Sequence, residues 1–252
     1  MAGFPDHLRD WRARRRVSQL DLGLAANVSA RHISFLETGR ARPSREMVAQ
    51  LGRALDMPLS SVNAMLLAAG FAPRYASTPL DAEEMAPVLR AVEWALDRHA
   101  PYPGMALDRD WCVRRLNDPA RRLFAPLGLA DGASLLDLLS NPLMPSVIEN
   151  WPEVAHASAQ RLRAESAAAG GIAALDRAAD ALSRTPAPDP LPTGPAIPAI
   201  YRLGEKRLSL FGMISTFSSV NDETLDDLRL ELFYPADAES EALLRALAAG
   251  EV

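Results

Sequence analysis

Two short helical segments separated by a three-residue turn are the feature that most constrains the fold of the N-terminal part of this chain. Ser18 and Ser29 are typical N-cap residues, and apolar residues follow each of them at three- and four-residue spacing. The spacing predicts helices over residues 19–26 and 30–38, joined by Asn27-Val28-Ser29. A turn of this length sets the second helix across the first, which is helix-turn-helix geometry.

The same periodicity predicts three more helices in this region. They are expected over residues 5–15, 45–55 and 59–69. Residues 1–75 are therefore predicted to form an all-α domain of five helices.

Charge divides the chain at about residue 75. Residues 1–75 contain 11 Arg and 6 acidic residues, a balance of +5, whereas residues 76–252 contain 16 Lys and Arg against 26 acidic residues, a balance of −10. The whole-chain balance of −5 therefore hides a basic domain. A basic domain joined to an acidic one is typical of a nucleic-acid-binding module on a body that DNA would repel. Double-stranded DNA is the expected partner, because the second helix of such a pair can enter a major groove roughly 12 Å wide.

The composition is that of an ordinary globular chain. Its 252 residues, 48 % of them hydrophobic, are enough for two compact domains with separate cores. Cys112 is the only cysteine, which excludes an internal disulfide and a cysteine-based zinc fold. The sequence has no signal-peptide pattern and no run of about 18 apolar residues. We therefore expect a cytoplasmic protein with no membrane partner and no bound metal.

The pattern changes after the basic domain. Residues 76–100 are predicted to form a connecting helix, and its amphipathic part, residues 80–99, is a candidate dimer element or lever. Residues 101–252 alternate short strands with helices and are predicted to form an α+β domain, so the chain is α+β overall. Strands are expected over residues 105–108, 111–116, 200–203, 207–217 and 230–234, and helices over 118–124, 134–139, 146–165, 171–183 and 238–249.

Two segments of this second domain carry specific expectations. Residues 185–199 contain six prolines in fifteen residues, which excludes a helix or a central strand and predicts an exposed, mobile loop. The segment Leu208–Phe217 places apolar side chains on both faces of one strand. Both faces of that strand are therefore expected to be covered, by helices or by a ligand.

In the first domain the residue types, and not only their spacing, match a known pattern. The pattern Ser18-Gln19-x-x-Leu22, Val28-Ser29-x-x-x-Ile33-Ser34-x-x-Glu37-x-Gly39-Arg40-x-x-Pro43-Ser44 resembles the xenobiotic-response-element family of bacterial and phage repressors. The resemblance implies a lambda-repressor-like domain in which Gln19 and Arg40 contact phosphates and the second helix faces the bases. The full set of expected DNA-binding residues is Arg16, Ser18, Gln19, Ser29, Ala30, Arg31, Ser34, Phe35, Arg40 and Arg42.

The roles within this set differ. Arg31, near the helix start, is suited to a bidentate contact with guanine. Phe35 is either a partly exposed reader of thymine methyl groups or a core residue. Glu37 is expected to be structural, as a cap or as the partner of a nearby arginine.

A second resemblance covers the later part of the chain. The segments Arg31–Arg40, Pro43–Met47, Leu67–Pro73, Pro101-Tyr102-Pro103-Gly104 and Asp108-Arg109-Asp110-Trp111 together are similar to MmyB-like regulators. That family joins this kind of head to a ligand-binding domain of PAS-like fold, and some members are associated with fatty-acid ligands. The resemblance implies an apolar small-molecule ligand such as a fatty acyl chain.

The candidate ligand-binding residues follow from the predicted strands and helices. Met105, Leu107, Phe211 and Met213 lie in predicted strands, and Trp151 follows a proline-rich turn, where it would form the mouth of a pocket. The helices between residues 134 and 183 would cover it. Apolar and aromatic side chains at these positions are also compatible with simple core packing.

An enzyme is not expected. The sequence has no glycine-rich phosphate loop, no His-Glu-x-x-His and no Gly-x-Ser-x-Gly, and its four histidines are scattered. We therefore predict no catalytic residues and no cofactor. The alternative to a small-molecule sensor is a second domain that grips a protein partner, as an antitoxin does, which predicts a large exposed apolar patch instead of an enclosed pocket.

Together these features predict a one-component bacterial transcriptional regulator with domains at residues 1–75 and 101–252. One helix-turn-helix domain reads little more than half of an operator site. Specific affinity of roughly 10⁻⁸ M or better usually requires two such domains, so a homodimer is expected.

Overall fold

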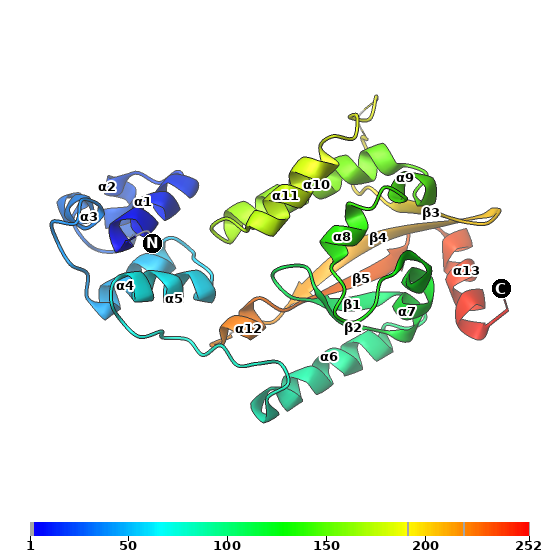
Figure 1. Ribbon diagram of the computed structural model, residues 1–252, viewed down its shortest axis with the longest axis horizontal. Coiled ribbons are helices and arrows are strands. Elements are labelled where there is room, and N and C mark those ends of the chain that lie inside the picture. Colours follow the sequence, from blue (N-terminus) through cyan, green and yellow to red (C-terminus); the bar gives the residue numbers. More distant parts are fainter. Residues whose placement is uncertain (1–2, 191, 219, 252) are drawn as a thin grey trace. The chain divides into compact units, whose positions relative to one another are not determined.

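The computed structural model describes residues 3–190, 192–218 and 220–251 (Figure 1). These residues form two compact units, which we describe separately. Unit 1 is built around residues 3–78, with the short segments 166–171 and 220–226. Unit 2 comprises residues 79–165, 172–218 and 227–251.

Unit 1 is helical, as predicted. Each predicted helix is present, with ends that differ from the expected ones by a single residue at most. The five helices are α1 (Phe4–Arg14), α2 (Gln19–Ala25), α3 (Ala30–Glu37), α4 (Arg45–Ala54) and α5 (Leu59–Ala68), and α12 (Glu223–Asp226) clusters with them.

One apolar core holds these helices together. Each helix from α1 to α5 contributes fully buried side chains to it, among them Leu8, Leu22, Ile33, Leu51 and Leu66. The close approach of α2 to α3 depends on Gly23, because a Cβ atom there would lie 2.8 Å from the carbonyl oxygen of Val28. A side chain at residue 23 would therefore push the turn and the start of α3 away from α2.

Unit 2 has the α+β composition that the sequence predicts. Its helices are α6 (Ala86–Arg98), α7 (Asp118–Phe124), α8 (Leu135–Leu139), α9 (Met144–Val147), α10 (Trp151–Ala168, of which residues 166–168 cluster with unit 1), α11 (Ala173–Leu182) and α13 (Ala238–Ala249), with short 3-10 turns at Glu83–Met85 and Ala125–Leu127. Its strands are β1 (Gly104–Leu107), β2 (Val113–Leu116), β3 (Ala199–Leu203), β4 (Lys206–Thr216) and β5 (Arg229–Pro235).

The five strands form one antiparallel sheet in the order β2-β1-β5-β4-β3. β4 and β5 pair from Leu210 opposite Pro235 to Thr216 opposite Arg229. Because side chains alternate between the faces of a strand, Leu210 and Gly212 share one face with Glu231 and Phe233. α8 and α10 cover this face, and α6 lies against the other (Figure 1).

Asn117 fastens three elements of unit 2 together. Its side-chain oxygen accepts hydrogen bonds from the backbone N–H groups of Gly104 and Ala120, both at 3.0 Å. Its amide nitrogen donates to the carbonyl oxygens of Leu96 at 3.0 Å and Tyr102 at 2.9 Å. This buried side chain thus ties the end of α6 to β1 and caps α7.

The structure corrects two predicted helices. The helix expected over residues 146–165 is divided into α9 and α10, each of which has a proline in its first turn. Proline suits the start of a helix and not its interior, so the chain begins a new helix at each proline. For the same reason Pro87 starts α6 instead of kinking a longer helix, and the predicted segment 80–99 becomes helical only from Glu83.

A third correction concerns strand β4. The expectation that both of its faces are covered is wrong, because Phe211, Met213 and Ile214 are exposed by 37 %, 49 % and 42 %. β3 pairs with residues 206–210 of β4 only, so within the described chain the edge of β4 from residue 211 to 216 has no partner strand. The proline-rich loop is mostly exposed and contains neither helix nor strand over the described residues 185–190 and 192–198, whereas Leu191 lies outside them.

Candidate functional site

The turn of unit 1 presents α3 with a well-capped start. The Ser18 hydroxyl accepts a hydrogen bond from the backbone N–H of Asp21, and the Ser29 hydroxyl accepts one from that of His32, both at 3.1 Å. Both serines thus act as N-caps in the way that the sequence predicts. Asn27, between the two helices, adopts a positive φ of 48°.

The surface around α3 carries free positive charge. Arg16, Arg31, Arg40 and Arg42 are exposed, and none of them forms an ion pair with a residue that the structure describes. The Arg31 guanidinium lies 5.3 Å from the centre of the Phe35 ring, which is partly exposed. This stacking orders the Arg31 side chain on the outer face of α3.

Glu37 is buried behind this face and pairs with an arginine, as predicted. Its carboxylate accepts hydrogen bonds from Nε and Nη2 of Arg12 and, at 2.7 Å, from the amide of Gln19. Burial alone would raise the pKa of Glu37, but the hydrogen bonds from Arg12 and Gln19 outweigh it and hold the pKa below its ordinary value. This hydrogen bond uses one of the two amide hydrogens of Gln19.

Unit 2 contains a pocket between the sheet and helices α8–α10. Its volume is about 240 Å³. The lining is mainly apolar and comes from Met105, Trp111, Phe124, Leu127, Leu129, Leu135, Leu138, Leu139, Met144, Ile148, Val154, Ala157, Ser158, Arg161, Ile197, Ala199, Tyr201, Leu210, Gly212, Glu231 and Phe233. An apolar cavity with a few converging polar groups is typical of a small-molecule site.

The charged residues of the pocket lining, Arg161 and Glu231, pair with each other. Arg161 of α10 donates through Nη1 and Nη2 to the two carboxylate oxygens of Glu231 on β5, at 2.9 and 3.0 Å. Its Nε donates to Glu165, one helical turn along α10, at 2.9 Å. Burial would lower the pKa of Arg161, but these hydrogen bonds raise it, so the guanidinium stays charged.

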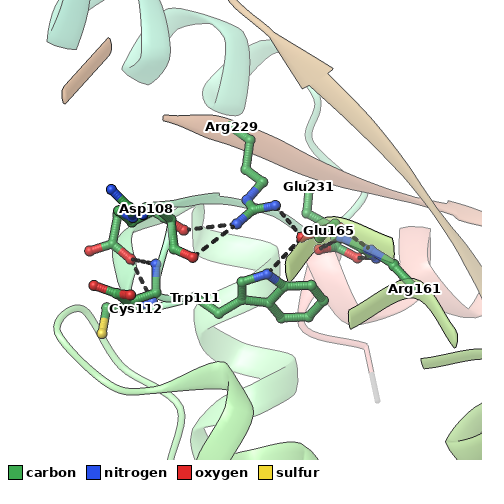
Figure 2. Close-up of polar contacts among 9 residues, drawn as sticks. Asp108, Trp111, Cys112, Arg161, Glu165, Arg229 and Glu231 are labelled. Carbon is green, nitrogen blue, oxygen red and sulfur yellow. Dashed lines mark hydrogen bonds and ion pairs between the residues drawn. The ribbon is translucent and has the colours of Figure 1, made fainter. Parts of the chain in front are cut away.

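A second arginine completes the cluster (Figure 2). Arg229 of β5 donates to Glu165, which also accepts a hydrogen bond from the Trp111 indole at 2.9 Å. The Arg161 and Arg229 guanidinium groups lie 4.5 and 5.4 Å from the centre of the Trp111 ring. Burial would raise the pKa of Glu165, but the two arginines and Trp111 hold it below its ordinary value.

A tight turn positions Trp111 for these contacts. Its φ of 60° lies in the left-handed region, which is a strained conformation for a bulky residue. The Asp108 carboxylate holds the turn by accepting from the backbone N–H groups of Asp110 and Cys112, both at 2.9 Å. Asp108 therefore caps this turn.

Tyr201 of β3 adds a hydroxyl to the pocket. Its ring contacts that of Phe124, with centroids 6.0 Å apart. Its oxygen makes no hydrogen bond to any residue within the described part of the chain. Burial, with a smaller effect of the Glu231 charge, raises the pKa of Tyr201, so the phenol remains protonated.

A larger hollow of about 570 Å³ lies between α7 and α13. Its charged side chains, Asp118, Arg122 and Lys206, are all exposed. The pocket with Arg161 and Glu231 is the stronger candidate. Binding sites typically combine an apolar cavity with a few converging polar groups whose pKa values are shifted.

Two models of known protein families match the chain. Residues 5–65 match the model of a helix-turn-helix domain, and residues 88–247 match that of the MmyB-like transcription regulator ligand binding domain. The chain belongs to the MmyB-like transcription regulators. No curated protein matches the chain.

Membership of the MmyB-like regulators confirms the family that the sequence resembles and the α+β class. Both matched domains are regulatory domains and not enzyme families. The described residues include no group of three or more metal-ligating side chains, and no helix among them is long and apolar enough to span a bilayer.

The structure places the predicted ligand residues of this MmyB-like domain unequally. Met105 lines the pocket, and Leu107 and Trp151 are buried outside its lining. Phe211 and Met213 point away from it, because they alternate with the lining residues Leu210 and Gly212. Of this set, only Met105 is placed to contact a ligand in the pocket.

Sequence reasoning missed the charged part of the pocket. Two signals were present: Arg161 and Glu165 are spaced to meet on one face of a helix, and Glu231 interrupts an apolar strand. The pairing of Arg161 with Glu231, 70 residues apart, depends on the packing of α10 on the sheet.

The lowered pKa of Glu37 predicts how unit 1 responds to acid. The ion pair contributes stability above the unfolded-state pKa of about 4.3, and this stability is lost as the pH falls through the lower folded-state pKa. Glu37→Gln should lower the free energy of unfolding by about 2 kcal/mol at pH 7 and make it less sensitive to pH between 6 and 3. Urea unfolding followed by circular dichroism measures both.

Glu46→Gln is the matched control, since Glu46 is exposed on α4 and forms no ion pair with a described residue. Equal effects of the two substitutions at pH 7 would show that the Glu37 pair does not stabilise the unit.

Proposed function

We propose that this protein is a one-component transcriptional regulator in which unit 1 binds operator DNA and unit 2 binds an apolar small molecule. The observation that carries the proposal is the apolar pocket in which the buried Glu231 pairs with the partly buried Arg161, inside a domain that matches a ligand-binding family. DNA binding would place the protein in the cytoplasm, in agreement with the expectation from its sequence.

The charge and exposure of unit 1 support DNA as the partner. Arg31 and Phe35 lie on the outer face of α3, where a recognition helix meets base edges, and Arg16, Arg40 and Arg42 flank it. Unpaired guanidinium groups of this kind bind phosphates and release counterions. Binding should therefore weaken steeply as salt concentration rises.

The size and lining of the pocket support an apolar ligand. The pocket volume is about 240 Å³. It holds about eight CH₂ groups if each occupies about 30 Å³, which is the volume of one water molecule in the liquid. Each buried CH₂ group contributes about 0.8 kcal/mol, so a chain of this length binds with few polar anchors. A fatty acyl chain of medium length fits this description, and the PAS-like character of the domain remains a prediction.

Regulation further requires unequal affinity. A ligand that binds the DNA-free and DNA-bound protein equally well does not change DNA affinity. A hundredfold difference between its two affinities corresponds to about 2.7 kcal/mol of coupling free energy. We propose that the pocket ligand provides such a difference.

A homodimer is the third part of the proposal. Among the described residues, no strand pairs with the outer edge of β4 from residue 211 to 216, where the apolar side chains of Phe211, Met213 and Ile214 are exposed. An edge of this kind pairs readily with another strand, and the same edge on two copies gives a two-fold interface. The patch also favours the alternative of a different protein partner, which the oligomeric state tests.

The DNA proposal predicts different effects for two arginines. Arg31→Ala should relax sequence preference by about 1–3 kcal/mol at one base pair, because its bidentate contact reads a base. Arg40→Ala should instead weaken all sites about equally and reduce the salt slope by about one. Selection of DNA fragments followed by gel-shift titration measures both; absence of binding at low salt, or an unchanged preference in Arg31→Ala, would contradict the proposal.

The pocket proposal predicts that a bulky residue inside it blocks ligand binding. 1-Octanol or octanoate should raise the melting temperature of the wild-type protein, and Ala157→Phe should abolish the rise because Ala157 lines the pocket. Ala164→Phe, on the exposed side of the same helix, should retain it. If neither compound stabilises the wild type, the pocket is not an apolar ligand site.

The dimer proposal predicts a mass of about twice 27.3 kDa in light scattering at micromolar concentration. Met213→Asp should give the monomer, since it places a charge in the interface, whereas Leu143→Asp at another exposed apolar site should not. A wild-type mass of 27.3 kDa would count against a homodimer and favour a different partner for the β4 patch.

A further inference from the structure

The charges in the pocket wall balance one another. Arg161 and Glu231 are the charged side chains among the lining residues, and they neutralise each other through two hydrogen bonds. Behind them Glu165 and Arg229 form a second pair. The cluster therefore contains two cations and two anions and has no net charge to offer a ligand.

Because the charges are balanced, a ligand with a charged group binds less favourably than one without. A carboxylate or an ammonium that enters the cavity loses its water and finds each opposite charge already paired. Such a group either breaks the Arg161–Glu231 pair and leaves the buried Glu231 carboxylate uncompensated, or accepts from a guanidinium whose charge is already balanced, so that no net opposite charge offsets its lost hydration. An uncharged polar group avoids both costs.

The pocket does offer unused hydrogen-bonding groups. Three of the five N–H groups of Arg161 donate to Glu165 and Glu231, which leaves two. The protonated Tyr201 hydroxyl makes no hydrogen bond to a described residue, and the Ser158 hydroxyl also lines the cavity. These groups suit a hydroxyl, amide or ester oxygen.

We propose that the ligand of this regulator is an uncharged amphiphile, a medium-length alkyl chain that ends in an alcohol, amide or ester, and that the pocket discriminates against the free fatty-acid anion. This inference rests on the proposed function of the pocket as an apolar ligand site. It adds the chemical class of the polar group.

The first test uses the wild-type protein and three probes of equal chain length. Isothermal calorimetry with 1-octanol, octanamide and octanoate at pH 7.5 should show the two neutral compounds binding at least about tenfold more tightly than octanoate. Octanoate affinity should rise about tenfold for each unit of pH decrease between pH 8 and 6, because only its protonated form is accepted. The 1-octanol affinity over the same range corrects for any titration of the protein.

A second test changes the balance of the cluster. Glu231→Gln leaves Arg161, Arg229 and Glu165 with one net positive charge, so octanoate should bind at least about tenfold more tightly than to wild type. Affinity for 1-octanol should change less than about threefold, because it does not depend on that charge. Glu149→Gln is the control, since Glu149 pairs with Arg207 outside the pocket lining.

The outcomes separate this inference from the proposed function. Octanoate binding to wild type as tightly as 1-octanol at pH 7.5, or without pH dependence, would overturn the inference and leave the apolar pocket intact. Failure of all three probes to bind would overturn the proposed ligand site and this inference with it. Circular dichroism shows whether Glu231→Gln is folded, and if it is not, the wild-type pH series alone decides.

Discussion

The bidentate pair of Arg161 and Glu231 is the interaction on which the rest of the candidate ligand site depends. It fastens α10 to β5, and these two elements form opposite walls of the pocket. Breaking a buried pair by removal of one partner typically costs about 3–5 kcal/mol, because the other charge is left uncompensated. The pair therefore joins the helix wall of the pocket to its sheet wall, and its balance of charge also restricts what the pocket can bind.

Trp111 links this pair to the start of the sheet. Its ring lies beneath both arginines, and its indole shares Glu165 with Arg229. The ring reaches this place through a strained backbone conformation held by Asp108. Strain of about 1–3 kcal/mol is maintained in folded proteins where the surrounding contacts compensate it, frequently at functional sites.

Local signals allowed much of the fold to be predicted from the sequence. The serine caps at 18 and 29 and the spacing of apolar residues give the helices of unit 1, because capping and periodicity are properties of neighbouring residues. The pairing of Glu231 with Arg161 and the exposure of Phe211 and Met213 could not be predicted in this way. Both depend on the order of strands in the sheet and on which segment covers which face, and a strand pattern alone carries neither.

The indole N–H resonances of the four tryptophans provide the most direct test of the claim that the ligand lies beside the charge-balanced cluster. Trp111 lines the pocket, whereas Trp94 is exposed on α6 and Trp11 belongs to the core of unit 1. In a ¹⁵N-resolved titration with 1-octanol, assigned with Trp111→Phe, the Trp111 signal should shift to saturation while those of Trp11 and Trp94 stay in place. A Trp111 signal that does not move while 1-octanol binds would place the ligand elsewhere and contradict the account.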